Sequence, residues 1–467
     1  MLKIFTKSAL IITLFLGQIP AVFASENKEL NVKDVVDSAV KNYPKILSHY
    51  DKINAAESSV LASKGFFDVK LKQSYSDRSR GYYDGKSYNI ELEKELGILG
   101  SKVYSGYRKS YGDFPSYEGG SYTNSGGEYR AGAKFSLLKD RDIDKSRLSV
   151  ILANLSLEEA KVEMENIKKE IERDAKKAYW TWVTDGKIYE IYDELYKLSF
   201  ERQKQLETRV AKGDVAQITA TENRKNILRR KSSLAKIRQE FENSAIYLSL
   251  FWRDSNGHPV VPKKSQLPNF TNNVRDLSVD QLNKDKLLAM SRRPELRLIK
   301  IKRDEENNNL KYAENLAKPQ LDVDVGASDD VGVGPKSRGQ SNNYAKIDFS
   351  VPLQQREAKG KISATESKLS AIKYEQKLLE EKISAQIDQL KTKVKTLVEV
   401  HSNLAEEVNL TETLEISERE KFKQGASNLF LVNAREQESA ASKAALVEIF
   451  RDYQELLAEY NFAVFAE

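Results

Sequence analysis

The side chains that most often carry out catalysis or bind metals are few in this sequence and far apart. It contains three histidines, His49, His258 and His401, and no cysteine. None of the histidines belongs to an HExxH zinc motif or accompanies a nucleophile elbow, and no glycine-rich phosphate loop is present. The lack of cysteine excludes disulfides and thiolate metal sites. We therefore predict that the chain is not an enzyme and has no metal site and no cofactor.

The composition favours an elongated helical protein over a globular one. Charged residues make up 31% of the 467-residue chain, and the mean hydropathy is −0.58, which leaves few apolar residues for a thick core. The formal net charge of +6 is spread along the sequence without a basic block. A nucleic-acid partner is therefore not indicated.

The first 24 residues have the features of a secretory signal peptide. Two lysines precede an apolar run from Ala9 to Leu16, and Val22-Phe23-Ala24 supplies a small residue before the cleavage point. The mature chain is therefore expected outside the cytoplasm, and without a cysteine it is not expected to be a lipoprotein. No later segment offers 18 consecutive apolar residues, so we expect no transmembrane helix.

Two regions, about 66–138 and about 320–353, alternate apolar and polar residues with a period of two. In the last of the alternating segments, for example, Ile347 and Phe349 flank Asp348. Such strands have lipid or core on one side and water on the other. The alternating segments are 67–75, 87–96, 102–111, 129–138, 321–327 and 345–353.

Tyrosines are concentrated in the first of these regions. Ten of the 22 tyrosines lie between Tyr75 and Tyr129. This enrichment near strand ends is typical of the aromatic girdle of an outer-membrane barrel. It is also compatible with a soluble, half-buried sheet that has aromatic cross-strand pairs.

The number of strands limits how such a sheet can lie in a membrane. Six strands are fewer than the roughly eight of the smallest membrane barrels, and an open edge in hydrocarbon leaves backbone groups unpaired. One chain therefore cannot span a bilayer with this sheet. If the sheet is embedded in a membrane, identical protomers must complete the barrel, most simply by cyclic assembly.

Two very long helices follow the strand regions. Residues from about Asp140 to Ala211 and from about Gln354 to Gln424 contain helix formers and no proline, and each helix would be roughly 100 Å long. In the second, apolar residues recur at alternating spacings of four and three, the pattern of a coiled-coil seam. We predict that His401 packs in this seam. The seam consists of Ile383, Ile387, Leu390, Val394, Leu397, His401, Leu404 and Val408.

Each long helix ends in a similar short turn. Gly213 and Gly425 provide the left-handed conformation that ends a helix, and Asp214 or Ser427 is expected to cap the next helix. Each turn would produce an antiparallel helical hairpin. The turns either serve folding alone or place two hairpin tips side by side as a docking rim.

Taken in order, these elements resemble the TolC-like outer-membrane efflux proteins over essentially the whole mature length. The matching motifs occur twice: Asn42 to Leu47 and Arg293 to Leu296 open the repeats, and Phe135 to Leu138 and Val351 to Leu353 lead into the long helices. Further matches are Pro319 at a strand start and the pattern Phe422, Gly425, Leu431 and Ala434 around the second turn. The resemblance implies a mostly α fold with β strands, in two structural repeats.

The resemblance also implies the domain organisation. Residues 25–253 would form the first efflux repeat, with strands at about 66–138 and a helical hairpin at about 141–252. Residues 254–276 would be an equatorial linker. Residues 277–467 would form the second repeat, with strands at about 320–353 and a hairpin at about 354–465.

By analogy, the protein would be a homotrimer whose strands build one outer-membrane barrel and whose hairpins build a periplasmic tunnel in a Gram-negative bacterium. Such trimers are exit ducts for an inner-membrane transporter, contacted by a periplasmic adaptor protein at the helical tips, in tripartite efflux or type I secretion systems. Opening would be a gating movement in which the hairpins splay. The implied adaptor-docking residues are Gly213, Asp214, Val215, Gly425, Ala426, Ser427 and Leu429.

Two departures from the family pattern limit this analogy. Relatives often carry acidic residues where this chain has Leu431 and Ala434, so a carboxylate ring at those positions is doubtful. Glu222, Glu418 and Glu420 are the candidates for lining the lumen or aperture, the alternative being ordinary solvated charges. The second departure is the additional strand pair at 87–96 and 102–111. A trimer would have 18 strands if this pair joins the barrel and 12 if it forms a rim hairpin.

A second class of protein shares most of these features. A soluble extracytoplasmic coiled-coil structural or adaptor protein would also have a signal peptide and long hairpins. Membrane fractionation separates the two hypotheses. The transported cargo stays open, because a wide water-filled lumen selects weakly.

Overall fold

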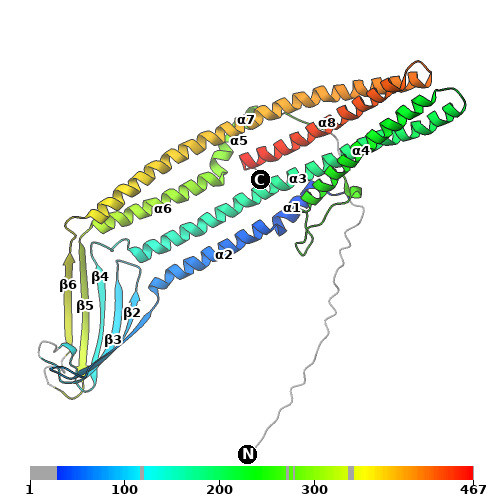
Figure 1. Ribbon diagram of the computed structural model, residues 1–467. Coiled ribbons are helices and arrows are strands. Elements are labelled where there is room, and N and C mark those ends of the chain that lie inside the picture. Colours follow the sequence, from blue (N-terminus) through cyan, green and yellow to red (C-terminus); the bar gives the residue numbers. More distant parts are fainter. Residues whose placement is uncertain (1–28, 116–119, 270–272, 277–278, 335–340, 466–467) are drawn as a thin grey trace, which may run out of the picture.

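The protein is an elongated molecule with a β-sheet at one end and a long helical arm (Figure 1). The computed structural model describes residues 29–115, 120–269, 273–276, 279–334 and 341–465. The predicted signal peptide lies outside the described residues. No helix in the described ranges has the length and apolar character needed to cross a membrane.

All six predicted strands are present, and they form one antiparallel sheet. The strands are β1 (Lys70–Arg78), β2 (Gly85–Glu95), β3 (Lys102–Gly112), β4 (Gly127–Ser136), β5 (Gln320–Val331) and β6 (Asn342–Ser350). Their spatial order is the order in the chain, β1 to β6, so β1 and β6 are the two edges. The additional pair, β2 and β3, therefore lies inside the sheet and is not a separate rim hairpin.

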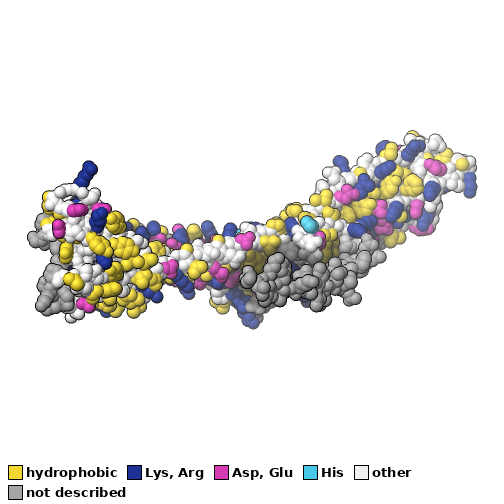
Figure 2. All heavy atoms as spheres, turned by 90° about the horizontal axis from the view of Figure 1, so that it is seen from below, with side chains coloured by type: hydrophobic (Ala, Val, Ile, Leu, Met, Phe, Trp, Pro, Cys, Tyr) yellow, Lys and Arg dark blue, Asp and Glu magenta, His cyan; other side chains and the backbone are white. Residues whose placement is uncertain are grey.

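The sheet has one polar and one apolar face, as the alternation predicts. Leu71 pairs with Leu92, and its neighbour Lys72 pairs with Glu91, so side chains of one kind share a face across the strands. The apolar face is open: Ile347 is 68% exposed in the single chain. A broad hydrophobic area covers the sheet end of the molecule (Figure 2).

Ion pairs between neighbouring strands cover the polar face. Glu93 on β2 pairs with Lys72 on β1, with 2.7 Å between the nitrogen and oxygen, and with Lys102 on β3. Lys134 on β4 pairs with Asp322 on β5 at 3.0 Å. This face is suited to contact with water, whereas the opposite face is suited to an apolar medium.

The helices occur in the same order in both halves of the chain. Each half has two shorter helices before its strands and two after them. The first set is α1 (Val32–Asn42), α2 (Pro44–Lys64), α3 (Lys145–Ala211) and α4 (Gln217–Leu248). The second set is α5 (Val279–Arg292), α6 (Pro294–Ala317), α7 (Arg356–Lys423) and α8 (Leu429–Val464). The predicted long helices are α3, with 67 residues, and α7, with 68.

The helices pack side by side in a single layer. In the half of the arm next to the sheet, the contacts run α2–α3–α6–α7, and in the other half they run α4–α3–α8–α7. The first part of the predicted seam of α7 is confirmed, because Ile383, Ile387 and Val394 are buried against α8 residues such as Tyr453. The later members of the seam, including His401, are half-buried. The layer therefore ends in two open edges, α7 on one side and α2 and α4 on the other.

The segment between the repeats crosses the arm at mid-length. Leu267 packs against α3 at Gly186, where the β-carbon of any larger residue would lie 2.6 Å from the leucine side chain. The backbone N–H of Leu30 donates to the carbonyl of Gln266 at 2.9 Å. Gly186 in the long helix thus permits close packing of this segment over the core around Trp182.

Candidate docking rim and aperture at the helical tips

The two helical tips have the same backbone geometry. Gly213 and Gly425 adopt φ values of +83° and +79°. In the first tip the N–H of Asp214 donates to the carbonyl of Arg209 at 2.9 Å, and in the second the N–H of Ala426 donates to that of Lys421 at 2.8 Å. These are the bonds of a Schellman helix ending, for which a left-handed glycine is the favoured residue. Both predicted turns are therefore confirmed.

The helix caps differ from the prediction. The N-cap of α4 is Ala216, which provides no side-chain bond, and the N-cap of α8 is Asn428, whose Oδ1 accepts from the N–H of Leu431 at 2.9 Å. Asp214 and Ser427 lie too early in the turns to reach the first turn of the next helix. Ser427 instead donates its hydroxyl to the carboxylate of Glu418.

Most of the predicted rim residues lie on the surface of the tips. Gly213, Asp214, Gly425 and Ala426 are exposed, and Val215 and Ser427 are half-buried. Leu429 is different. It is only 4% exposed and packs with Leu206 of α3 and Ala220 of α4. The exposed apolar side chain is its neighbour Phe430, at 80%. Leu429 therefore joins the two hairpins and is not available at the rim surface.

The three candidate aperture carboxylates lie in different environments. Glu222 is exposed on α4, and Glu420 is exposed near the end of α7, where it pairs with Lys423 at 3.3 Å. Glu418 is buried and bonded to Ser427. The single chain thus leaves only Glu222 and Glu420 open to solvent, and it does not bring the three carboxylates together.

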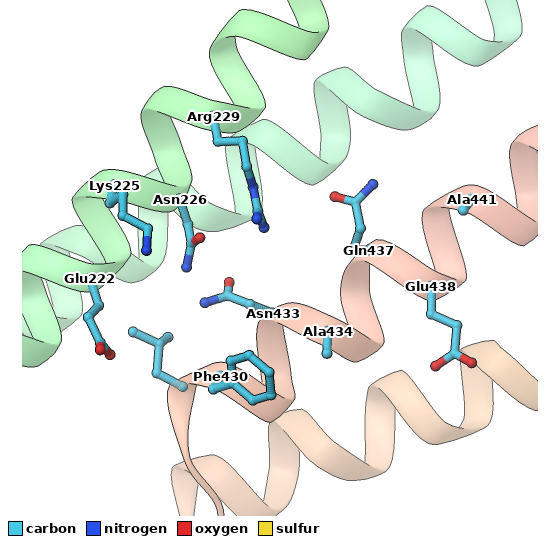
Figure 3. Close-up of a pocket in the computed structure, with 11 residues that line it drawn as sticks. Glu222, Lys225, Asn226, Arg229, Phe430, Asn433, Ala434, Gln437, Glu438 and Ala441 are labelled. Carbon is cyan, nitrogen blue, oxygen red and sulfur yellow. The ribbon is translucent and has the colours of Figure 1, made fainter.

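A groove runs between α4 and α8 beside the tips. It encloses about 500 Å³, and its walls include Glu222, Lys225 and Arg229 from α4 and Phe430 and Gln437 from α8. Figure 3 shows these side chains facing one another across the groove. Both helices also pack on α3.

Sequence reasoning missed a buried charge cluster that joins all four tip helices. Glu436 of α8 is 1% exposed. Its carboxylate pairs with Arg202 of α3, with Arg230 of α4 at 3.0 Å and with Arg419 of α7 at 3.0 Å. Arg202 also donates to the side-chain oxygen of Asn433 at 3.0 Å. The two hairpins, which lie in different repeats, are therefore connected through one carboxylate.

Burial and the arginines act on Glu436 in opposite directions. Burial alone would raise the pKa of its carboxyl, but the positive charges of Arg202 and Arg230 outweigh burial and hold the pKa below its ordinary value. Burial also lowers the pKa of Arg230, and the charge of Glu436 partly offsets this effect. The carboxylate of Glu436 is therefore ionised at neutral pH.

The sequence carries one signal of this cluster. Asn223, Ile227, Arg230, Leu234, Ile237 and Phe241 follow a four-three spacing along the face of α4 that packs on α3. An arginine in such a seam is expected to have a buried acidic partner. The identity of that partner, more than 200 residues away, is not evident from spacing.

Several solved structures share this arrangement of helices and strands. CusC, described in terms of folding and transmembrane channel formation, superimposes with a TM-score of 0.65 at 13% identity, over 93% of this chain and 92% of CusC. The outer membrane protein VceC of Vibrio cholerae gives 0.65 at 12% identity, over 93% and 95% of the two chains. The MtrE outer membrane channel of Neisseria gonorrhoeae gives 0.64 at 12% identity, over 93% and 88%.

The likeness defines the class of fold. The chain has the TolC-like fold, in which long helices and an antiparallel sheet are arranged in two repeats, and the resemblance seen in the sequence is confirmed at the level of the fold. The sequence matches no protein-family model and no curated protein.

Proposed function

We propose that this protein is a passive outer-membrane exit duct. The observation that carries the proposal is the six-stranded sheet, which has one apolar face, one polar face and two unpaired edges, β1 and β6. An edge strand exposes a row of unpaired N–H and C=O groups, which are costly in hydrocarbon. A membrane position for this sheet therefore requires β1 of one copy to pair with β6 of the next.

Three copies would close an 18-stranded barrel. In that barrel the apolar face, with Leu71 and Ile347, lies toward lipid, and the polar face, with the Lys72–Glu93–Lys102 ion pairs, lines a water-filled lumen. Barrels of 16 to 18 strands are wide enough for an aqueous channel. The proposed localisation is therefore the outer membrane, with the helical arm in the periplasm.

The helical layer supports the same assembly. It ends in two open edges, with α7 at one and α4 at the other in the tip half. A head-to-tail ring of three copies would join these edges and enclose a tunnel that continues the barrel lumen. The same head-to-tail ring of three copies would thus close both the sheet and the helical layer.

At the tips, the proposed partner is a periplasmic adaptor protein, which connects the duct to an inner-membrane transporter. The exposed Asp214 and Ala426 and the neighbouring Phe430 offer a surface for it. The system would be a tripartite efflux or a type I secretion machine, with substrate choice made by the transporter. The protein itself performs no covalent chemistry in this proposal.

Purification of the mature chain tests the proposal. We expect it in the membrane fraction, requiring detergent, as a trimer by light scattering that dissociates on heating in SDS. In planar bilayers it should form long-lived ion-conducting pores. A chain that stays dispersed in detergent-free buffer as a monomer or dimer would support the soluble coiled-coil protein instead.

A further inference from the structure

A row of two tyrosines and two glycines crosses strands β3 to β6. Tyr104 on β3 is the register partner of Gly132 on β4. Gly132 is in turn the partner of Gly326 on β5, and Gly326 is the partner of Tyr344 on β6. The row lies on the polar face, because Tyr104 is opposite Glu93, the centre of the ion pairs on that face. Glycine is unfavourable inside a strand unless the backbone bends or another group approaches closely.

The two tyrosine rings occupy the space above the two glycines. A β-carbon built at Gly132 would be 2.6 Å from Cζ of Tyr104, and one built at Gly326 would be 2.6 Å from Cζ of Tyr344. Carbon atoms in contact are normally about 3.5–4.0 Å apart. Each ring can therefore lie across the neighbouring strand only because that strand has a glycine there.

The backbones of β4 and β5 also approach each other closely at this point. A β-carbon at Gly132 would be 2.8 Å from the carbonyl oxygen of Val325, and one at Gly326 would be 2.8 Å from the carbonyl oxygen of Ala131. Both β-carbons would point to the polar face. The close approach is therefore on that face, as expected for a sheet that bends toward it at a pair of glycines.

The hydroxyl groups of the two tyrosines meet between β4 and β5. Tyr104 donates to Oδ1 of Asp324 on β5 at 2.6 Å, and the two tyrosine hydroxyls are hydrogen-bonded to each other. A hydroxyl has one proton to donate. Because Tyr104 uses its proton for Asp324, Tyr344 donates to the oxygen of Tyr104. Two hydrogen bonds thus connect β3, β5 and β6.

This site is where the two repeats meet within the sheet. Strands β1 to β4 precede the long helix α3, and β5 and β6 precede α7. In the order β1 to β6, strands of the two repeats pair with each other at β4 and β5 (Figure 1). Tyr104 and Tyr344 are 240 residues apart in the chain. Their side chains therefore connect the two repeats on the polar face, in addition to the backbone hydrogen bonds.

A third long side chain lies along the polar face in the same manner. Arg130 on β4 extends over Gly106 on β3, where a β-carbon would be 3.4 Å from its Nε. The guanidinium then pairs with Glu91 on β2 at 2.6 Å. Side chains that follow the sheet in this way leave the space in front of the polar face free.

We propose that Tyr104, Tyr344 and Asp324 form a latch that fastens the two repeats of each protomer together on the lumen face of the barrel. The inference rests on the proposed barrel and adds to it what holds the wall in shape. A barrel wall must bend toward its lumen, and the two glycines permit this bend because they carry no side chains that would crowd on the inner face. The hydrogen-bonded hydroxyls hold the bend and keep both rings against the wall, out of the path of the cargo.

Removal of the hydroxyls tests the latch without changing the shape of either ring. Tyr104→Phe breaks both hydrogen bonds, so the detergent-solubilised trimer should dissociate about tenfold faster in SDS at a fixed elevated temperature. Adding Tyr344→Phe should increase the rate by less than about twofold, because its bond is already lost. The control is Tyr129→Phe on the apolar face of β4, which should leave the rate within about twofold.

Hydrogen exchange of the trimer shows where the latch acts. In Tyr104→Phe, the protection of backbone amides at 131–134 of β4 and 324–327 of β5 should fall about tenfold. The amides of β1 and β2 should change by less than about twofold, because the latch does not reach these strands. General loss of stability would instead increase exchange in all six strands.

The outcomes separate this inference from the proposed function. A chain that is monomeric by light scattering contradicts the duct itself. A trimer in which Tyr104→Phe and Tyr129→Phe dissociate at equal rates, or in which exchange increases evenly over the sheet, contradicts the latch and leaves the duct in place. A further tenfold effect of Tyr344→Phe in the Tyr104→Phe chain would also contradict it, because the two hydroxyls would then act independently.

Discussion

At the residue scale, the central feature of the arm is the carboxylate of Glu436. Arg202, Arg230 and Arg419 approach it from the three other tip helices. Removing one partner of a buried ion pair leaves uncompensated charge and typically costs about 3–5 kcal/mol. The cluster therefore makes separation of the two hairpins within one protomer costly. If the protein opens by splaying of its hairpins, as the family resemblance implies, the movement must either break this cluster or take place outside it.

The substitution Glu436→Gln tests this role. The buried Arg230 and the half-buried Arg202 and Arg419 would lose the carboxylate that they share. We expect the local free energy of opening around residues 429–440 to fall by about 3 kcal/mol. Native-state hydrogen exchange measures this directly. The matched control is Glu438→Gln on the same helix, where an exposed pair with Arg435 is lost, with an expected effect below about 1 kcal/mol. Equal effects of the two variants would contradict the role of Glu436.

The same carboxylate predicts how the tips respond to pH. The pKa of Glu436 is held below its ordinary value of 4.5 by Arg202, Arg230 and Arg419. A carboxyl with a lower pKa in the folded state stabilises that state fully above 4.5, and the contribution is lost as the pH falls through the folded pKa. The hydrogen-exchange protection of the backbone amides of residues 429–440 should thus stay constant from pH 8 to about pH 5. It should decrease once the pH is below about 4.5. The Glu436→Gln variant should not show this loss of protection at low pH. If the variant still loses protection, other carboxyl groups are responsible for the effect.

At the element scale, the two hairpin turns each need a residue with a left-handed backbone conformation, and the space around that residue is empty. Gly213 and Gly425 have positive φ, and no atom lies within 4 Å of a β-carbon built at either position. A larger residue therefore meets backbone strain of about 1–2 kcal/mol but no clash. The turns are sites where bulk can be added to the rim while the hairpins stay folded.

Valine at both turns, Gly213→Val with Gly425→Val, should reduce export strongly and leave the trimer intact. The reason is that the added side chains protrude where the adaptor is proposed to bind. Export of a fluorescent substrate and light scattering of the purified protein measure the two properties. Gly360→Val on α7 is the control, because its β-carbon also meets open space but φ is not positive there. Loss of the trimer would mean that the turns serve folding and not docking.

At the scale of the whole molecule, the two faces of the sheet determine which environment it can occupy. Every residue of the apolar face alternates with a residue of the polar face, so a substitution tests one environment at a time. Ile347 and Lys346 are adjacent on β6 and lie on opposite faces. Substitutions at these two positions therefore test the lipid face and the lumen face of the proposed barrel separately.

Ile347→Lys should destabilise the membrane-embedded trimer by about 2–4 kcal/mol if the residue lies near the bilayer midplane. The reason is that a charge would replace an apolar side chain on the lipid face. The measurement is the fraction of heat-modifiable trimer in the membrane fraction. Lys346→Gln, on the lumen side, should have little effect on that fraction. If both substitutions, or neither, removed the trimer, the assigned faces would be wrong.

Local patterns accounted for most of the fold. The six strands, the two long helices and both glycine turns were predicted because alternation, four-three spacing and a left-handed glycine depend on residues close in the chain. The caps were less accurate: Asn428, and not Ser427, caps α8, because one residue of offset in a turn decides which side chain reaches the helix. Leu429 was assigned to the rim, but it is buried between the hairpins.

By itself, then, the sequence determined the element types, their order in two repeats and the two-faced character of the sheet. Only the tertiary structure decided that β2 and β3 lie within one continuous sheet, and that Arg202 meets Glu436 across 234 residues of chain. The physical reason is that periodicity reports which way a side chain points within its own element. Which element it then meets depends on packing between segments distant in the chain, and no local pattern records that choice.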